Sequence, residues 1–188
     1  QAYLNQPSLR VFVNLEQELP RLASVLDAEP DRVFRVGTGE FMDSLALDPW
    51  VRWTDLLLPF FSSRGNAVLE LKTKTDCVEG VLASRERRGV VVSWSLNSPS
   101  ITAGEEQGAP SIRRRLQAAR RCQDEGLVVG FHFDPLIHYA GWQEGYLRTL
   151  DMLDEYVDPG RIIWISLGCM RYLPALKPII RRRHPRSV

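Results

Sequence analysis

The sequence has few cysteines and few lysines for its 188 residues. Its three cysteines, Cys77, Cys122 and Cys169, lie far apart without any CxxC spacing. An odd number of scattered cysteines argues against a disulfide framework, so we expect a reducing, cytoplasmic compartment. Lysine occurs only at positions 72, 74 and 177, although lysine and arginine together number 24.

Long hydrophobic runs and an excess of either charge are also lacking. No apolar run is long enough to span a membrane and no signal peptide is visible, so we expect no membrane partner. The 24 basic residues nearly balance 23 acidic ones, which indicates no strong field for a polyanion. The length and the 44% hydrophobic content predict one globular domain over residues 1–188.

Five apolar segments turn polar at their C-terminal ends, and a helix-like stretch follows each one. They cover residues 33–40, 67–75, 90–98, 127–135 and 162–168. This repetition is typical of a parallel α/β barrel, in which ligands bind at the C-terminal ends of the strands. A doubly wound open sheet fits the same order of elements almost as well.

Local signals predict further elements between these segments. We expect a short strand at 10–14, a helix from Leu15 to Leu26 capped by Asn14, and a helix that begins at Asp48-Pro49. Residues 97–110 are rich in Ser, Gly and Pro and predict a loop. Ser111 is a predicted helix cap, and Arg113–Arg115 are expected mainly on the solvent face of that helix.

Two strand ends carry charged or permissive residues that suit a ligand. Gly37-Thr38-Gly39-Glu40 combines glycines, which allow a close approach, with a carboxylate that could hold an amine; a plain turn is the alternative. Lys72 and Lys74 are two residues apart and share a side of their strand. A lysine that points inward needs an anion, whereas beyond the strand end both would lie in solvent. We expect Lys72 to lie deeper or in an ion pair and to affect folding more than ligand affinity.

His132, Asp134 and His138 have the spacing of ligands in metal-dependent barrel hydrolases. Because three or four converging ligands are needed, we expect no metal site and interpret this set as a polar rim. A hydrolase that uses these residues stays open as the alternative activity, and a non-catalytic binding scaffold is a third interpretation.

Six segments keep one order and spacing: RVFVNLE (10–16), GTGEFMDSL (37–45), LKTKT (71–75), SWSLNS (93–98), GFHFDPLI (130–137) and GWQEGY (141–146). Together they resemble the spore photoproduct lyase branch of the radical S-adenosylmethionine enzymes. The resemblance implies an α/β fold, a partial TIM-like barrel of parallel strands with outer helices. It also implies a [4Fe–4S] cluster, reductive cleavage of S-adenosylmethionine to a 5′-deoxyadenosyl radical, and a thymine lesion in DNA as the substrate.

The resemblance assigns cofactor contacts to residues of this chain. Gly37, Thr38, Gly39 and Glu40 match a motif near the methionine amine, and Lys74 matches a lysine that reaches the cofactor. Ser95 and Asn97 match a strand end beside the ribose and carboxylate. Asp134 matches a strand end beside the adenosyl group. DNA and an electron donor for the cluster are the implied partners.

Two departures from the family pattern stand out. The three cluster cysteines, spaced CxxxCxxC, are absent, and Gln1–Leu4 is similar to the segment that follows them. We therefore expect a fragment that lacks the first strand, binds no iron by itself, and has a parent with the motif just before Gln1. The lyase also has a hydrogen-donating cysteine at about the place of Gly39-Glu40. Its absence here argues for a related enzyme with another substrate.

Overall fold

A five-stranded parallel sheet is the centre of the computed structural model, which describes residues 11–39, 42–169, 174–183 and 185. Its strands lie in sequence order: β1 (Phe34–Gly37), β2 (Ala67–Thr73), β3 (Val90–Ser95), β4 (Val128–Leu136) and β5 (Ile162–Cys169). A sheet that grows in one direction differs from a doubly wound sheet, whose strand order reverses. The partial barrel is therefore confirmed, and the alternative is wrong.

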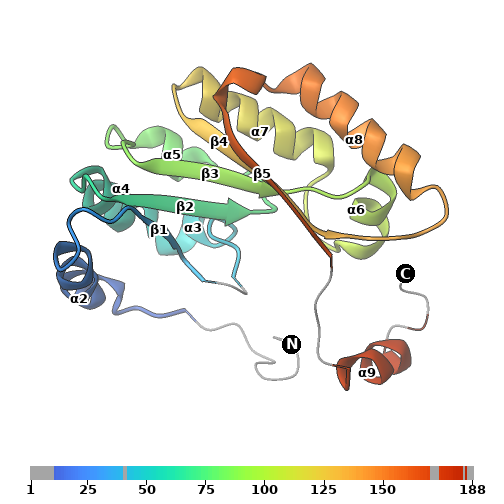
Figure 1. Cartoon of the computed structure of the whole chain (residues 1–188), viewed down its shortest axis with the longest axis horizontal. Helices are drawn as coiled ribbons and strands as arrows, with labels where there is room; N and C mark the ends of the chain where they lie inside the picture. Colours follow the sequence, from blue (N-terminus) through green and yellow to red (C-terminus); the bar gives the residue numbers. More distant parts are fainter. Residues whose placement is uncertain (1–10, 40–41, 170–173, 184, 186–188) are drawn as a thin grey trace.

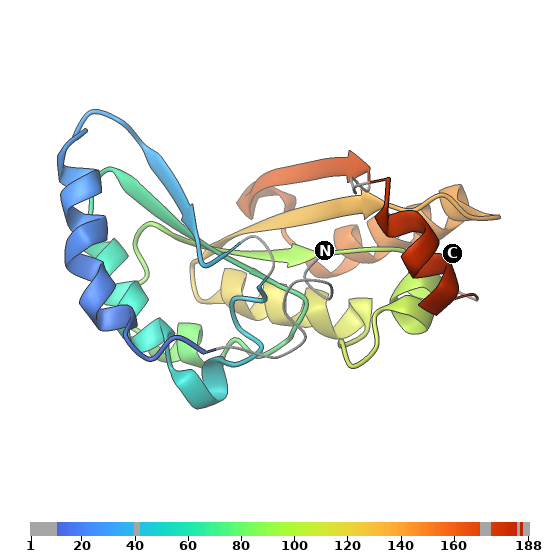
Figure 2. The same ribbon diagram turned by 90° about the horizontal axis from the view of Figure 1, so that it is seen from below.

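The helices between the strands lie on one face of the curled sheet (Figures 1 and 2). Right-handed crossovers between strands added in one direction place every connecting helix on the same side. The elements between the strands are α3 (Asp48–Val51), α4 (Thr54–Ser62), α5 (Glu79–Ala83), α6 (Pro99–Glu105), α7 (Ile112–Asp124), α8 (Trp142–Tyr156) and the 3₁₀ turn η1 (Pro159–Arg161). Helix α2 (Leu15–Asp27) precedes β1, and α9 (Leu176–Arg183) follows β5.

The hydrophobic core fills the space between the sheet and these helices. Leu69 and Leu71 of β2 and Trp94 of β3 are almost fully buried on this face. Helix α7 covers β3 and β4, with Leu116 and Cys122 buried. Because side chains alternate along a strand, the residues between these core positions point to the other, concave face of the sheet.

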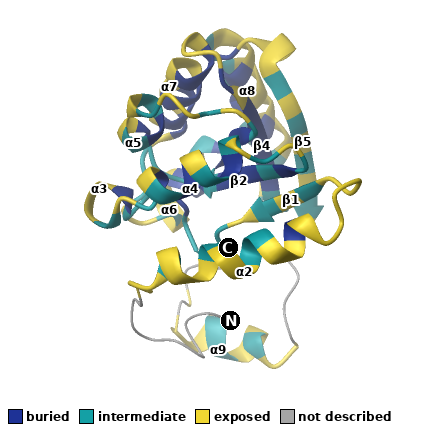
Figure 3. Ribbon diagram, turned by 90° about the vertical axis from the view of Figure 1, so that its left-hand side faces the viewer, coloured by how far each residue is buried: buried dark blue, intermediate teal, exposed yellow. Residues whose placement is uncertain are grey.

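Strand β5 presents an uncovered apolar surface. Its residues Ile163, Ile165 and Leu167 are about half exposed or more, and Figure 3 shows the strand alternating between exposed and intermediate positions. The opposite side of the same strand carries Trp164 and Ser166 toward the concave face.

Several local predictions hold and others are wrong. The helix capped by Ser111 is confirmed, because the Ser111 hydroxyl accepts a hydrogen bond from the Arg114 amide at 3.4 Å. The strand at 10–14 is wrong: its described residues 11–14 are exposed and lead into α2. A strand needs a neighbour to take its hydrogen bonds, and β1 pairs with β2 alone among the described strands.

The predicted loop at 97–110 contains helix α6. Ser98 caps it by accepting from the Ile101 amide at 3.4 Å, and Pro99 occupies the first turn. The helix predicted from Asp48 is instead two short helices, α3 and α4, interrupted at Arg52, which has a left-handed φ of 52°. The Asp48 carboxylate accepts from the Thr54 amide and hydroxyl at 3.0 and 2.6 Å, which holds this break together.

Within the described residues, no helix has both the length and the apolar character that a membrane span requires.

Candidate functional site on the concave face

A chain of polar side chains crosses the concave face from β1 to β5. Glu70 of β2 accepts from Arg35 of β1 at 2.8 Å and from Ser93 of β3 at 2.7 Å. The Glu70 oxygen that accepts from Ser93 is Oε1, and the same atom lies 2.7 Å from His132 Nε2 of β4. Ser166 of β5 lies 2.6 Å from His132 Nδ1 and donates to Asp134 at 2.6 Å. We define these six residues as the concave network: Arg35, Glu70, Ser93, His132, Asp134 and Ser166.

Glu70 is ionised at neutral pH because of its partners. Burial by itself raises the pKa of Glu70, but hydrogen bonds from His132, Ser93 and Arg35 and the charge of Arg35 outweigh burial and bring the pKa to about 2. Its side chain is only 9% exposed, so a carboxylate charge is held inside the half-barrel. Such a charge is stable only while its partners remain in place.

A second cluster lies at the C-terminal ends of β2 and β3. Glu106, in the turn after α6, forms ion pairs with Lys74 and with Arg115 of α7. Arg115 is fully buried and also donates to the Ser95 carbonyl at 2.8 Å, which corrects the prediction of a solvent-facing side chain. We call Lys74, Asn97, Glu106 and Arg115 the strand-end cluster. It contains two cations and one carboxylate, and so keeps a positive charge beside the strand ends.

The strand-end cluster is tied to α8 through Asn97. The Asn97 side chain accepts from the Tyr146 hydroxyl at 2.6 Å, and its backbone carbonyl accepts from Thr149 at 2.9 Å. Its amide contacts Glu106 at 3.5 Å. Burial opposes ionisation of Glu106, but the charges and hydrogen bonds of Lys74 and Arg115 lower its pKa overall. Asn97 is buried and links the strand-end cluster to α8.

The glycine segment lies at the exposed end of β1. Gly37 and Gly39 are exposed, and Gly39 has a φ of 151°, which side chains rarely adopt. The Thr38 hydroxyl bonds Ser44 at 2.8 Å. Glu40 lies outside the described residues, so its predicted contact with an amine stays a prediction.

Besides the buried indole nitrogen of Trp164, three polar groups on the concave face have no hydrogen-bond or ion-pair partner among the described residues. They are the Lys72 ammonium, the Ser95 hydroxyl and Oδ1 of Asp134, which come from β2, β3 and β4. We call them the free polar row. Lys72 was expected to lie deeper or in an ion pair; it lies half-buried within β2 and has no ion pair among the described residues. Half-buried polar groups without partners are rare unless water or a ligand satisfies them.

The N-terminal part of the concave face is closed by an aromatic contact between the two edge strands. The Arg35 guanidinium of β1 lies 4.1 Å from the ring centroid of Trp164 of β5. Trp164 also packs against Gly130, where an added Cβ would lie 2.4 Å from the indole nitrogen. Ligands can therefore reach the free polar row from the C-terminal ends of the strands, above this contact.

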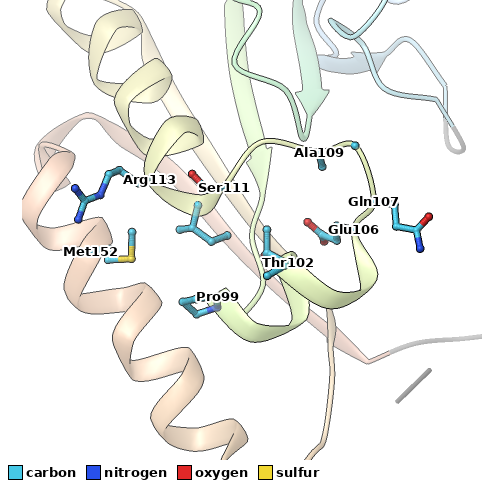
Figure 4. A pocket seen from close by; sticks show the side chains of 11 residues that line it. Pro99, Thr102, Glu106, Gln107, Ala109, Ser111, Arg113 and Met152 are labelled. Atoms are coloured by element: carbon cyan, nitrogen blue, oxygen red, sulfur yellow. The ribbon is translucent and has the colours of Figure 1, made fainter. Parts of the chain in front are cut away.

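A pocket of about 460 Å³ lies among α6, α7 and α8 (Figure 4). Thr102, Arg113 and Met152 are among its lining residues, and the buried Thr102 hydroxyl has no hydrogen-bond partner in the described part of the chain. Glu106 lines the pocket, but no site residue predicted from the sequence does. We therefore place the candidate site on the concave face and at the strand ends beside it, which carry Lys74, Ser95 and Asp134.

The residues suggested for a metal hydrolase do not converge. Both ring nitrogens of His132 are engaged, by Glu70 and Ser166, which leaves no lone pair directed at a metal. His138 is exposed, and the centroid of its ring lies 6.0 Å from that of Trp142. In the described ranges, no three His, Cys, Asp or Glu side chains are grouped so that they could hold a metal ion.

Sequence reasoning brought together only part of this site. Lys74 and Asn97 both contact the Glu106 carboxylate. Asp134 lies apart from them on β4, and Gly37 and Gly39 lie at the end of β1. It missed Glu70, although an acidic residue inside the apolar run 67–71 signals a buried partner. It also missed Glu106, which lies in a segment interpreted as a loop.

Comparisons with known proteins show the family of this chain. The family model described as "Spore photoproduct lyase" matches residues 2–188. The chain belongs to the spore photoproduct lyase family. Curated relatives include the spore photoproduct lyases of Geobacillus sp. (strain Y412MC61), 23% identical, and Bacillus subtilis (strain 168), 22% identical, each over 97% of this chain. The chain spans about half the length of these relatives, 54% in each case.

Solved structures of the family share the fold. A spore photoproduct lyase variant with bound AdoMet and dinucleoside spore photoproduct has a TM-score of 0.91 and 23% identity, over 100% of this chain and 56% of that one. A spore photoproduct lyase complexed with the dinucleoside has a TM-score of 0.89 and 22% identity, over 99% and 55%. The half-barrel is thus the fold of part of a spore photoproduct lyase.

Proposed function

We propose that the concave face binds S-adenosylmethionine, and that the chain forms the cofactor-binding half-barrel of a radical S-adenosylmethionine enzyme that acts on a DNA lesion. Family membership supports this proposal, as does the AdoMet found in the similar solved structure. The observation that carries it for this chain is the free polar row. It offers a cation, a hydroxyl and a carboxylate oxygen on one face, without partners in the described residues.

The chemistry of S-adenosylmethionine fits these groups. Its methionine part carries a carboxylate and an amine, and its ribose carries hydroxyls. Lys72 suits the carboxylate, together with the net positive strand-end cluster that contains Lys74 and Asn97. Asp134 and Ser95 suit the hydroxyls, while Gly37 to Glu40 would lie near the amine. Lys72 is the addition that the structure makes to the residues proposed from the sequence.

The described residues do not fit the [4Fe–4S] cluster. Cys77, Cys122 and Cys169 lie after β2, in α7 and at the end of β5. Burial raises the pKa of the Cys122 thiol to about 12, so it is not available as a thiolate ligand. We derive no step on a cluster from this chain, and its ligands would have to come from elsewhere.

The bound cofactor would supply a 5′-deoxyadenosyl group. The family resemblance implies that this group becomes a hydrogen-abstracting radical after electron donation. The residues of this chain would hold the cofactor and keep water out beneath it, through the concave network and the Arg35–Trp164 contact. A lesion in DNA is the proposed substrate class, and a lesion other than the dinucleoside spore photoproduct is favoured by one difference from the lyase. The hydrogen-donating cysteine of the lyase has no counterpart next to Gly39.

Calorimetric titration of S-adenosylmethionine into this chain tests the proposal. A hydrogen bond to a charged group contributes roughly 1.5–3 kcal/mol. Lys72→Ala and Asp134→Asn should therefore each weaken binding by roughly 10- to 100-fold. Lys177→Ala is the matched control, because it removes an exposed lysine on α9 and should leave the affinity unchanged.

Circular dichroism would establish that each variant folds. Equal affinities in folded wild-type, Lys72→Ala and Asp134→Asn proteins would show that the cofactor does not bind at the concave face. The family assignment would then stand for the fold alone. Anaerobic turnover of the dinucleoside lesion by cluster-loaded protein that contains this chain would test the substrate separately.

A further inference from the structure

The protonation state of His132 follows from the hydrogen bonds of the concave network. Its Nε2 lies 2.7 Å from Oε1 of Glu70, and its Nδ1 lies 2.6 Å from the Ser166 hydroxyl. The ring is almost fully buried, with a side-chain exposure of 5%. Water therefore contributes little to satisfying either nitrogen, and both must be matched by protein partners.

The Glu70 side of the ring requires a proton on Nε2. An ionised carboxylate has only acceptor sites, and Glu70 is ionised because Arg35 and Ser93 also donate to it. Two acceptors held 2.7 Å apart, without a proton between them, would repel each other. Nε2 therefore donates to Glu70.

The Ser166 side requires a proton on Nδ1 as well. Ser166 has one hydroxyl proton and lies 2.6 Å from both His132 Nδ1 and Asp134 Oδ2. The carboxylate of Asp134 accepts the hydroxyl proton, so the serine oxygen is left to accept from Nδ1. Nδ1 and Oδ2 of Asp134 are 3.5 Å apart, close enough for direct attraction between opposite charges.

The charges around the ring agree with this count. Arg35 from β1 is a cation, while Glu70 from β2 and Asp134 from β4 are anions, and β3 and β5 contribute only serines at the contacts. Lys72 of β2 is a further cation on this face. The two charged groups in direct contact with the ring, Glu70 and Asp134, are both anions, which favours the charged form of the ring.

We propose that His132 is a doubly protonated positioning residue, which fixes the ionised Asp134 carboxylate through Ser166 so that its Oδ1 stays directed at the ligand. This role rests on the proposed function, because Asp134 is taken to contact S-adenosylmethionine. His132 acts through Ser166 and does not itself touch the cofactor.

Nitrogen NMR of the histidine-labelled chain tests the protonation state directly. His132→Gln assigns the ring signals, and the exposed His138 serves as an internal reference. At pH 7, both ring nitrogens of His132 should show the shifts of protonated imidazolium. A spectrum with one protonated and one bare nitrogen would overturn the proposal, since Asp134 would then have to carry the proton.

Two serine variants separate positioning from general stability. Ser166→Ala removes the link between His132 and Asp134, whereas Ser93→Ala removes a bond of similar length to Glu70 without touching Asp134. We expect Ser166→Ala to weaken S-adenosylmethionine binding by about five- to tenfold and Ser93→Ala by less than about twofold. Equal effects would contradict the positioning role. If wild type binds no cofactor, the proposed function fails, and the NMR result still decides the protonation state.

Discussion

Replacing Glu70 with glutamine should destabilise the fold in a way that depends on pH. The concave network lowers the pKa of Glu70 from an ordinary 4.5 to about 2. At 1.36 kcal/mol for each pKa unit, this difference corresponds to about 3 kcal/mol of folding free energy. Arg35 is 51% exposed and its share is screened by water, so we expect Glu70→Gln to cost about 2–3 kcal/mol at pH 7.

The sign of the pH dependence follows from the lowered pKa. A carboxyl group whose folded pKa is depressed stabilises the protein fully above its unfolded pKa of about 4.5. That contribution is lost as the pH falls from 4.5 toward 2, because the unfolded state, with its higher pKa, takes up the proton first. The gap in unfolding free energy between wild type and Glu70→Gln should therefore shrink by roughly half between pH 7 and pH 3.

Urea unfolding of both proteins across this pH range gives the measurement. Glu79→Gln is the matched control: Glu79 is 70% exposed on α5, and its loss should change stability by less than about 0.5 kcal/mol. A gap below about 1 kcal/mol at pH 7, or a gap that does not vary with pH, would refute the argument that buried partners hold Glu70 ionised.

Three further predictions concern single sites. Glu106→Gln leaves Lys74 and the buried Arg115 without a carboxylate and should destabilise the chain by about 3 kcal/mol in thermal or urea unfolding; a loss below about 1 kcal/mol would contradict this. Gly130→Ala places a Cβ 2.4 Å from the Trp164 indole nitrogen and should cost about 1–3 kcal/mol, with a change in tryptophan fluorescence. Thiol titration of the native protein should modify the exposed Cys169 rapidly and the buried Cys122 only after unfolding, since burial raises the pKa of Cys122 to about 12; equal rates would contradict its burial.

The strands were predictable because their signal is local. The run Val90–Trp94 is apolar apart from Ser93, and such a run suits a parallel strand that is buried on both faces; the structure places β3 there, with every residue buried. The cap at Ser111 was predictable for the same reason, since a cap bonds an amide three residues away. The cap at Ser98 has an equally local signal, but the surrounding glycines and serines obscured it.

The partners of charged residues were not predictable, because they come from distant parts of the chain. Arg115 lies among arginines on a helix, and only the fold brings Glu106 and the Ser95 carbonyl to its guanidinium. Lys74 was expected to face a ligand and pairs with Glu106. Lys72 was expected to lie deeper or in an ion pair, and it has no partner among the described residues.

The sequence by itself determined the order of strands and helices, the family, and the polar character of the strand ends. Hydrophobic periodicity and short-range hydrogen bonds carry that information along the chain. The tertiary structure decided which polar groups are satisfied. Curling of the sheet brings Arg35 over Trp164 and Glu70 against His132, pairs that are far apart in sequence. Only this curvature sets which charges are neutralised within the fold and which remain free for a ligand.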